Sequence, residues 1–176
     1  ALAQLRHYHT QPFHLEAISV DLGFAGMDFS PVRDYCETQD IPFTLVPTQI
    51  SQVVFEAREE TNPCSLCAKM RKGALMGAAA ERGCRKVALG HHYEDAVETM
   101  LMSLIFEGRI SCFSPVTHLD RRDVYQIRPM LYVHESMTKG AAQRLGLPVV
   151  KNACPMDTAS KRKEIKELIA RLEQQY

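Results

Sequence analysis

A chain of 176 residues suits a single domain, and contents of 45% hydrophobic and 24% charged residues are ordinary for a soluble globular protein. The sequence has no run of about 18 apolar residues and no charged stretch followed by an apolar one at its start, so neither a membrane span nor a secretory signal is visible. We therefore expect a cytoplasmic protein whose six cysteines are reduced, which favours metal binding or catalysis over a disulfide framework. Because the formal net charge is zero, contact with nucleic acid would have to come from local basic patches.

The chain begins with ALAQLRHYH, which lacks an initiator Met and lies within a helical pattern that reaches Gln11 and Pro12. We expect a single domain over residues 1–176 that is incomplete at its N-terminus, with a strand and a loop upstream.

Strands and helices are expected to alternate along the chain. Short runs of apolar and β-favouring residues predict strands at 14–22, 42–46, 85–90 and 148–150. Capping residues, helical periodicity and terminal glycines predict helices at 1–9, 30–38, 64–82, 94–107 and 159–175, with a short helix or loop at 52–60. A hairpin is expected across 114–128. This order predicts an α/β fold, a parallel sheet with helices on both faces, whose ligands lie beyond the carboxyl ends of the strands.

The segment ALGHHYEDAVETML, residues 88–101, places unusual residues at such a strand end. The strand delivers Gly90 and His91 to its tip, and Glu94, Asp95 and Glu98 fall in the first turns of the next helix. Acidic residues there can simply cap the helix, because a helix N-terminus favours negative charge. Capping does not explain a Gly-His-His sequence facing the usual ligand crevice.

Two cysteines, Cys64 and Cys67, open the helix expected at 64–82 in the stretch TNPCSLCAKMRKGAL. They could form a redox dithiol, since a helix N-terminus lowers the pKa of a thiol. They could bind zinc, although a structural zinc site needs four ligands and the sequence has no second close pair of cysteines. Together with Cys154, in KNACPMD, they could also hold an iron–sulfur cluster. The residues alone leave these alternatives open.

Four motifs carry a resemblance that spans almost the whole chain. GHHYEDAVET resembles the second signature of the PP-loop ATP pyrophosphatases, which adenylate a substrate with ATP. CSLCAKMRKGAL, IRPMLYVHE and NACPMD resemble, in order and spacing, the tRNA 2-thiocytidine synthetase branch of that family. The resemblance implies a sheet of the adenine nucleotide α-hydrolase type and ATP-dependent insertion of sulfur into a tRNA base.

The same resemblance implies roles for individual residues. His91 and Asp95 would be catalytic and help to position ATP and Mg²⁺, and the nucleotide site would also include Gly90, Asp21 and Leu22. Asp21 could instead merely start a turn before Gly23. Cys64, Cys67 and Cys154 would hold a [4Fe–4S] cluster, with one iron left free of protein ligands.

Two features depart from the family pattern. Glu94 stands where the signature usually has Asp, which is a conservative change. The family's Ser-Gly-Gly-x-Asp-Ser phosphate loop is absent, which is consistent with the expected upstream segment. If the 176 residues were the whole polypeptide, we would predict no adenylation activity.

Basic residues predict where tRNA would bind. They gather beside the cysteine pair and at the last helix, and Arg128 matches a family motif; the candidates are Lys69, Arg71, Lys72, Arg128, Lys161, Arg162 and Lys163. A solvated helix face is the simpler explanation for such runs. The resemblance further implies a sulfur donor such as a cysteine desulfurase system and a homodimer. An adenylating sulfurtransferase with another tRNA position or a small molecule as acceptor, or a non-catalytic metal-binding module, are the alternatives.

Overall fold

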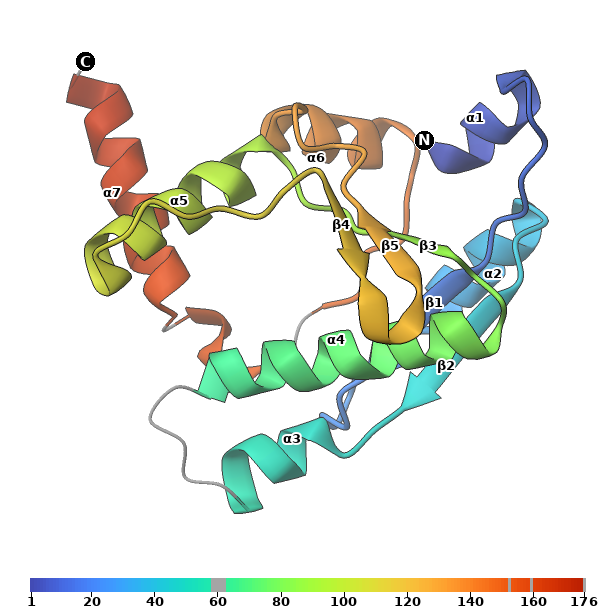
Figure 1. The fold of residues 1–176 in the computed structure, drawn as a ribbon, viewed down its shortest axis with the longest axis horizontal. Coiled ribbons are helices and arrows are strands. Elements are labelled where there is room, and N and C mark those ends of the chain that lie inside the picture. The colour runs from blue at the N-terminus through green and yellow to red at the C-terminus, as the bar shows by residue number, and fades with distance from the viewer. Residues whose placement is uncertain (58–62, 152, 159, 176) are drawn as a thin grey trace. The chain divides into compact units, whose positions relative to one another are not determined.

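The computed structural model describes residues 1–57, 63–151, 153–158 and 160–175. The helices are α1 (Leu2–Tyr8), α2 (Ser30–Thr38), α3 (Ile50–Gln52), α4 (Pro63–Glu81), α5 (Tyr93–Glu107), α6 (Glu135–Arg144) and α7 (Lys161–Gln175) (Figure 1). The strands are β1 (Ala17–Asp21), β2 (Phe43–Pro47), β3 (Lys86–Ala88), β4 (Val116–Leu119) and β5 (Val124–Ile127). Helix α3 continues into a π-helical turn at Val53–Ala57, and 3₁₀ turns lie at Asp120–Arg122 and Pro155–Thr158.

The chain divides into two compact units, one formed by residues 1–79 and 147–153 and the other by residues 80–146 and 154–176. In the first unit, β1 and β2 pair in parallel, with Ala17 opposite Phe43. The core of this unit forms where β1 ends and α3 begins, around Leu22, Ile50 and Val54. Apolar side chains collect here because burial removes their surface from water.

The second unit contains a three-stranded sheet with β5 at its centre. Strand β3 pairs with β5 in parallel, whereas β4 and β5 form an antiparallel hairpin. Val124 and Gln126 of the central strand are almost completely buried. Helices α5 and α7 pack against each other in the same unit (Figure 1).

These elements confirm the predicted α/β class with parallel strands. The predicted helix at 30–38 has the bounds of α2, and the helices predicted at 64–82 and 94–107 agree with α4 and α5 to within one residue at each end. The hairpin turns at the expected residues, where Asp123 adopts a left-handed conformation.

Two parts of the prediction were wrong. Residues 148–150 do not form a strand: they pair with no described strand, Pro148 has no N–H to donate, and the side chain of Val149 is exposed. Helix α6 was not predicted, because its sequence ESMTKGAAQR has no clear apolar stripe and buries no residue.

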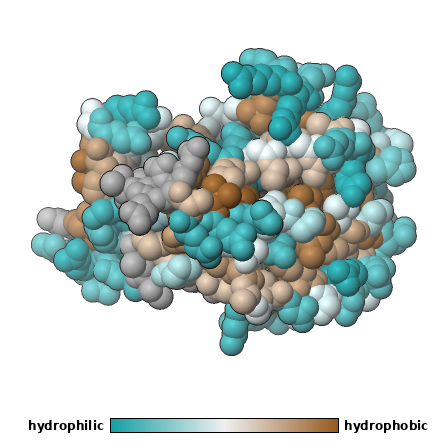
Figure 2. All heavy atoms as spheres, turned by 90° about the horizontal axis from the view of Figure 1, so that it is seen from below, coloured by the Kyte–Doolittle hydropathy of each residue, from teal (hydrophilic) through white to brown (hydrophobic). Residues whose placement is uncertain are grey.

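The helical periodicity of α5 predicts a packed apolar face at Val97, Met100, Leu101, Leu104 and Ile105, and the structure buries this face only in part. Met100, Leu104 and Ile105 are exposed, whereas Glu98 and Ser103 of the same helix are buried. The packed side of α5 is therefore largely its polar side. Figure 2 shows, on one face of the molecule, hydrophobic residues lying between hydrophilic ones. No helix in the described part of the chain is long and apolar enough to cross a membrane.

Candidate nucleotide and metal sites

The tip of β3 leads directly into the first turn of α5. The N–H of Leu89 donates to the carbonyl of Ile127 at 2.9 Å, which ties the end of β3 to β5. Gly90 follows in an open position, where an added Cβ would meet only the end of the Met130 side chain, at 3.6 Å. The backbone here can approach a ligand closely.

His91 lies at this tip beside an aromatic ring. Its ring centroid is 4.9 Å from that of Phe113. The imidazole is partly buried, so its orientation is constrained by packing. The second unit thus brings together Gly90, His91 and Asp95, three of the residues that the sequence predicted for nucleotide binding.

Asp95 is held by contacts to both of its carboxylate oxygens. Oδ2 accepts a hydrogen bond from the backbone N–H of His92 at 3.0 Å, which caps the start of α5. Oδ1 accepts one from the guanidinium of Arg162, on α7, at 3.3 Å. The same guanidinium nitrogen donates to Glu98 at 2.9 Å. Asp95 therefore has a fixed orientation at the helix N-terminus, where bound anions are favoured.

Glu94, the residue that departs from the family pattern, connects α5 to α6. Its carboxylate lies 3.0 Å from Nδ1 of His134 and accepts a hydrogen bond from the N–H of Glu135 at 2.8 Å. Burial raises the pKa of this carboxyl, but these hydrogen bonds outweigh burial and bring the pKa down from 4.5 to about 2. The longer side chain of Glu, compared with Asp, has the reach for these contacts.

Glu135 continues this connection to α7. Its carboxylate accepts a hydrogen bond from Nζ of Lys166 at 2.7 Å and pairs with Lys139 at 3.1 Å. The Lys166 contact lowers the pKa of Glu135, and the same contact raises the pKa of Lys166. Sequence reasoning gave no role to His134 or Glu135; their place at the end of the IRPMLYVHE motif was the available signal.

Asp21 and Leu22, the other predicted nucleotide residues, lie in the first unit. Asp21 ends β1, and its Oδ1 accepts a hydrogen bond from the N–H of Gly23 at 2.9 Å, as expected for a turn. Leu22 is buried in the core with Ile50 and Val54. Asp21 is the more accessible of the two, while the side chain of Leu22 serves packing.

Cys64 and Cys67 lie in the first turns of α4, as predicted. The thiol of Cys64 is exposed, and Cys67 packs against the core of the first unit. Cys154 belongs to the second unit and directly precedes the 3₁₀ turn at Pro155–Thr158. All six cysteines lie within the described residues, and none of them forms a disulfide. The described residues contain no group of three His, Cys, Asp or Glu side chains arranged to hold a metal ion.

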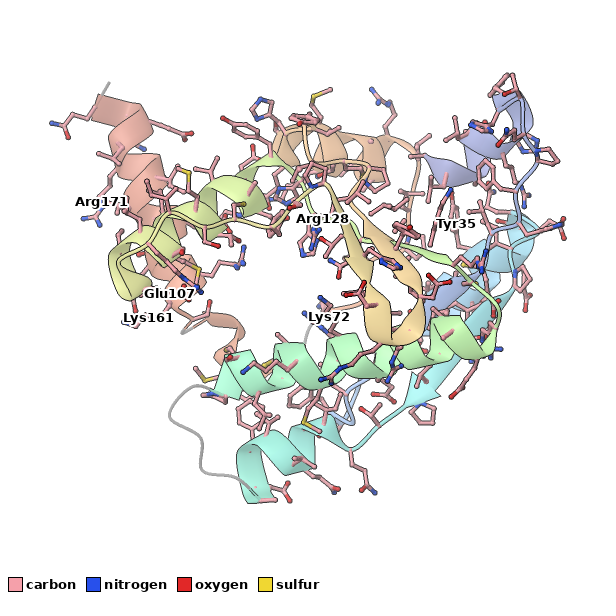
Figure 3. The ribbon with its side chains drawn as sticks, viewed as in Figure 1. Tyr35, Lys72, Glu107, Arg128, Lys161 and Arg171 are labelled. Carbon is pink, nitrogen blue, oxygen red and sulfur yellow. The ribbon has the colours of Figure 1, made fainter. Side chains whose placement is uncertain are left out.

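The predicted basic residues fall into two classes. Lys69, Arg71, Lys72, Lys161 and Lys163 are exposed, and Figure 3 shows Lys72 projecting from α4. Lys161 pairs with Glu164 at 2.9 Å. Arg128 and Arg162 instead make internal contacts. The guanidinium of Arg128 lies 4.5 Å from the Phe113 ring centroid and donates to the carbonyl of Ser114, and its burial lowers its pKa.

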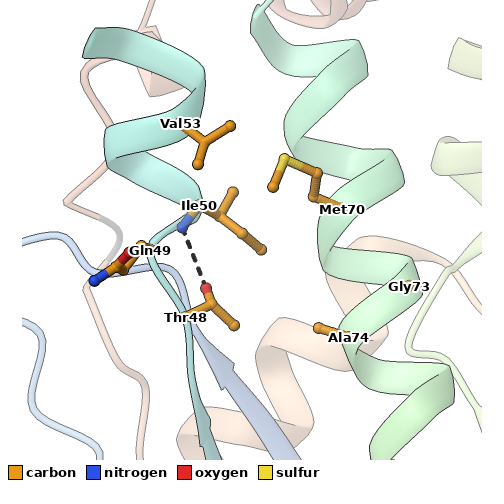
Figure 4. Close-up of a pocket in the computed structure, with 7 residues that line it drawn as sticks. All are labelled: Thr48, Gln49, Ile50, Val53, Met70, Gly73 and Ala74. Carbon is orange, nitrogen blue, oxygen red and sulfur yellow. Dashed lines mark hydrogen bonds between the residues drawn. The ribbon is translucent and has the colours of Figure 1, made fainter. Parts of the chain in front are cut away.

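An apolar cavity of about 300 Å³ lies between α3 and α4 in the first unit (Figure 4). It is lined by Thr48, Gln49, Ile50, Val53, Met70, Gly73 and Ala74. The N–H of Ile50 donates a hydrogen bond to Thr48 Oγ1 at 3.4 Å within this lining. The sequence did not predict this cavity, because its lining residues read as ordinary core positions.

Comparison with known proteins finds relatives that modify tRNA. A tRNA-cytidine(32) 2-sulfurtransferase of Pelobacter propionicus is 36% identical over 177 aligned residues, which cover 99% of this chain and 66% of that protein. The corresponding protein of Syntrophotalea carbinolica is 33% identical, with 97% and 67% covered. The chain thus spans about two thirds of the length of these relatives.

Among solved structures, the U34-tRNA thiolase NcsA from Methanococcus maripaludis with its [4Fe–4S] cluster matches with a TM-score of 0.77 and 25% identity. The match covers 98% of this chain and 60% of that one, and it confirms a fold of the adenine nucleotide α-hydrolase type. A family model of the PP-loop domain matches residues 2–172. The chain therefore belongs to the PP-loop domain family.

Proposed function

We propose that the protein containing this chain is an ATP-dependent tRNA thiolation enzyme that acts on a cytidine. The observation that carries the proposal is that one chain holds both an oriented Asp95 at the start of α5 and a Cys-x-x-Cys pair in the first turns of α4. This chain is 36% identical to a tRNA-cytidine(32) 2-sulfurtransferase. The first feature suits a nucleotide and the second suits a metal. Together they suit sulfur insertion that is driven by adenylation.

The nucleotide would bind at the tip of β3. The N-terminus of α5 and the open Gly90 suit the negative charge and close approach of phosphates. Asp95 would orient Mg²⁺ with its remaining lone pairs, and His91 would contact the nucleotide. ATP would convert the base carbonyl oxygen into a leaving group, which departs with AMP when sulfur attacks the ring carbon. We propose Asp21 as a further contact to this nucleotide, with Leu22 supporting it from the core.

The three cysteines Cys64, Cys67 and Cys154 would hold the [4Fe–4S] cluster. Their chemistry fits the group, since thiolates are the usual ligands of such clusters, none of the three forms a disulfide and Cys64 is exposed. Three thiolates leave one iron without a protein ligand, where the cluster, when bound, can supply sulfur. A cysteine desulfurase system would provide that sulfur, and a cytoplasmic location and a homodimer would match a tRNA-modifying enzyme.

The tRNA backbone would contact the exposed basic residues on α4, Lys69, Arg71 and Lys72, and those on α7, Lys161 and Lys163. Arg128 and Arg162 were also predicted to bind RNA. Their internal contacts make them weaker candidates than the exposed lysines, because an engaged guanidinium has fewer free donors for phosphate.

The decisive experiment measures iron, zinc and acid-labile sulfide in the full-length protein purified without oxygen. Iron and sulfide in roughly equal amounts, lost in Cys64→Ala and Cys154→Ala but kept in the matched control Cys84→Ala, is the expected result. Zinc without sulfide would refute the cluster. Protein that holds neither metal and fails to bind ATP would leave no support for an enzyme.

The structural match to a U34-tRNA thiolase favours a second candidate, thiolation of a uridine at another tRNA position. Nucleoside analysis of tRNA from a deletion strain separates the two. Loss of 2-thiocytidine supports the first candidate, and loss of a thiouridine supports the second.

A further inference from the structure

Arg162, at the start of α7, reaches three side chains of α5. One guanidinium nitrogen donates to Asp95 at 3.3 Å and to Glu98 at 2.9 Å, and the other lies 3.3 Å from Thr99 Oγ1. These three positions lie on one face of the helix because they are separated by three and four residues. A planar guanidinium can serve all three at once, whereas an ammonium could not hold this geometry.

Glu98 makes this contact necessary. Its side chain is only 4% exposed, and Arg162 is the cation that the described residues place on its carboxylate. A buried carboxylate without a partner is strongly unfavourable. Glu98 therefore fixes the position of the guanidinium, and the guanidinium in turn fixes Asp95.

Thr99 completes the arrangement. Its hydroxyl donates a hydrogen bond to the backbone carbonyl of Asp95 at 2.7 Å, and the hydroxyl oxygen accepts one from Arg162. Asp95 is thus restrained through its backbone, through Oδ1 by Arg162 and through Oδ2 by the N–H of His92. No freedom is left for the carboxylate to turn while these contacts persist.

The position of Arg162 in the chain adds a second consequence. Within the same unit, a short segment that contains the 3₁₀ turn at Pro155–Thr158 joins Cys154 to α7. The contacts of Arg162 thus hold the first turn of the helix that follows Cys154 in the chain. Lys166 anchors α7 separately, on Glu135.

We propose that Arg162, backed by Glu98, is a positioning residue that sets the orientation of Asp95 for Mg²⁺·ATP and links the nucleotide-binding helix to the segment that bears Cys154. The inference rests on the proposed function. It differs from the RNA-binding role predicted from the sequence, because the guanidinium acts here through a carboxylate of the same unit.

The test uses the full-length protein with Arg162→Gln, Glu98→Gln and the double variant. For each we would measure the unfolding midpoint, the affinity for Mg²⁺·ATP by calorimetry, and kcat and KM for ATP. Arg162→Gln is expected to lower both stability and Mg²⁺·ATP affinity, the latter about 10–100-fold, as is typical when the partner of a metal-orienting group is removed. The double variant is expected to regain stability, because no buried charge is left alone, but not the affinity.

Lys139→Gln is the control, since it removes a cation of the same unit that pairs with Glu135 and has no contact with Asp95 or Glu98 among the described residues. It should leave Mg²⁺·ATP affinity and kcat unchanged. Recovery of both stability and affinity in the double variant would show a purely structural role and overturn the inference, as would unchanged affinity in Arg162→Gln. Wild-type protein that binds no ATP would instead refute the proposed function. Wild-type protein that binds ATP but does not thiolate tRNA would refute thiolation and still allow the Arg162 test.

Discussion

At the scale of single residues, Glu94 shows how one carboxylate joins two motifs. It links the start of α5 to the N-terminal turn of α6 through His134 and Glu135. In this chain the Glu side chain reaches both partners from the first turn of α5. Through these contacts the residue connects α5 to α6 beside Asp95.

The low pKa of Glu94 predicts how stability depends on pH. A carboxyl with a pKa of about 2 in the folded protein and 4.5 as its ordinary value contributes stability above pH 4.5, and this contribution is lost as the pH falls toward 2. Glu94→Gln is therefore expected to destabilise the protein at pH 7 and to differ little from wild type near pH 2. Urea unfolding of both proteins across this range checks it; a constant difference would contradict the assignment.

The cysteines predict a pattern of thiol reactivity. Cys64 and Cys112 are exposed, while Cys36 is buried and burial raises the pKa of its thiol. Because the thiolate is the reactive form, metal-free protein should be alkylated at Cys64 and Cys112 long before Cys36. Iodoacetamide labelling followed by peptide mass spectrometry measures the order.

Loading with iron and sulfide should protect Cys64 and leave Cys112 reactive, since only Cys64 is a proposed ligand. Cys112 is the internal control, because it is exposed like Cys64 and also forms no disulfide. Equal labelling of the two cysteines in the iron-loaded protein would argue against Cys64 as a ligand.

At the scale of elements, the turn after β1 depends on a glycine. Gly23 has a φ of +84°, and an added Cβ would lie 2.9 Å from the carbonyl oxygen of Thr48. Gly83, after α4, has a φ of +70° with nothing within 4 Å. The two positions therefore share a left-handed backbone but differ in crowding.

Gly83→Ala should cost about 1 kcal/mol of stability, the usual strain of a left-handed non-glycine residue. Gly23→Ala should cost more, because the backbone carbonyl must also shift. It should also weaken ATP binding if Asp21 contacts the nucleotide, since the N–H of Gly23 holds the Asp21 carboxylate. Chemical denaturation compares the two variants, and equal losses would show that the Thr48 contact is relieved without cost.

Local sequence signals predicted most elements but not how they pack. Pro31, Gly83 and Gly108 marked helix ends correctly, because these residues act through the backbone alone. Helix α6 escaped prediction because it buries no residue and its sequence shows no apolar stripe. The apolar stripe on α5 predicted burial of residues that are exposed, and it gave no sign that Glu98 is buried. Burial of Glu98 depends on Arg162, a partner far along the chain. The motifs located Asp95, but the contacts that orient it are tertiary.

At the scale of the whole molecule, the charge distribution decides how a neutral protein could bind an anionic polymer. With 21 basic and 21 acidic residues, the chain has no net field that would attract tRNA. Some basic residues are engaged by carboxylates of the same unit, as Arg162 and Lys166 are. Binding must then depend on where exposed lysines and arginines gather, as Lys69 and Lys72 do on α4.

This predicts a specific salt dependence. Each phosphate neutralised by a lysine releases counterions and adds about 0.9 to the slope of log K against log salt concentration for duplex nucleic acid. Removing Lys69 and Lys72 together should therefore weaken tRNA binding and make the slope shallower by about 2. Fluorescence anisotropy with labelled tRNA at increasing salt measures both quantities for the full-length protein.

The control replaces Arg33 and Lys86 with Ala, which removes the same charge from two exposed positions outside the predicted contact. If net charge alone governed binding, both double variants would change the slope equally, and the proposed contact on α4 would be refuted. If the lysines of α4 touch phosphate, only their removal makes the slope shallower. The control should then bind with nearly wild-type affinity, because screening at physiological salt confines each charge to about 8 Å.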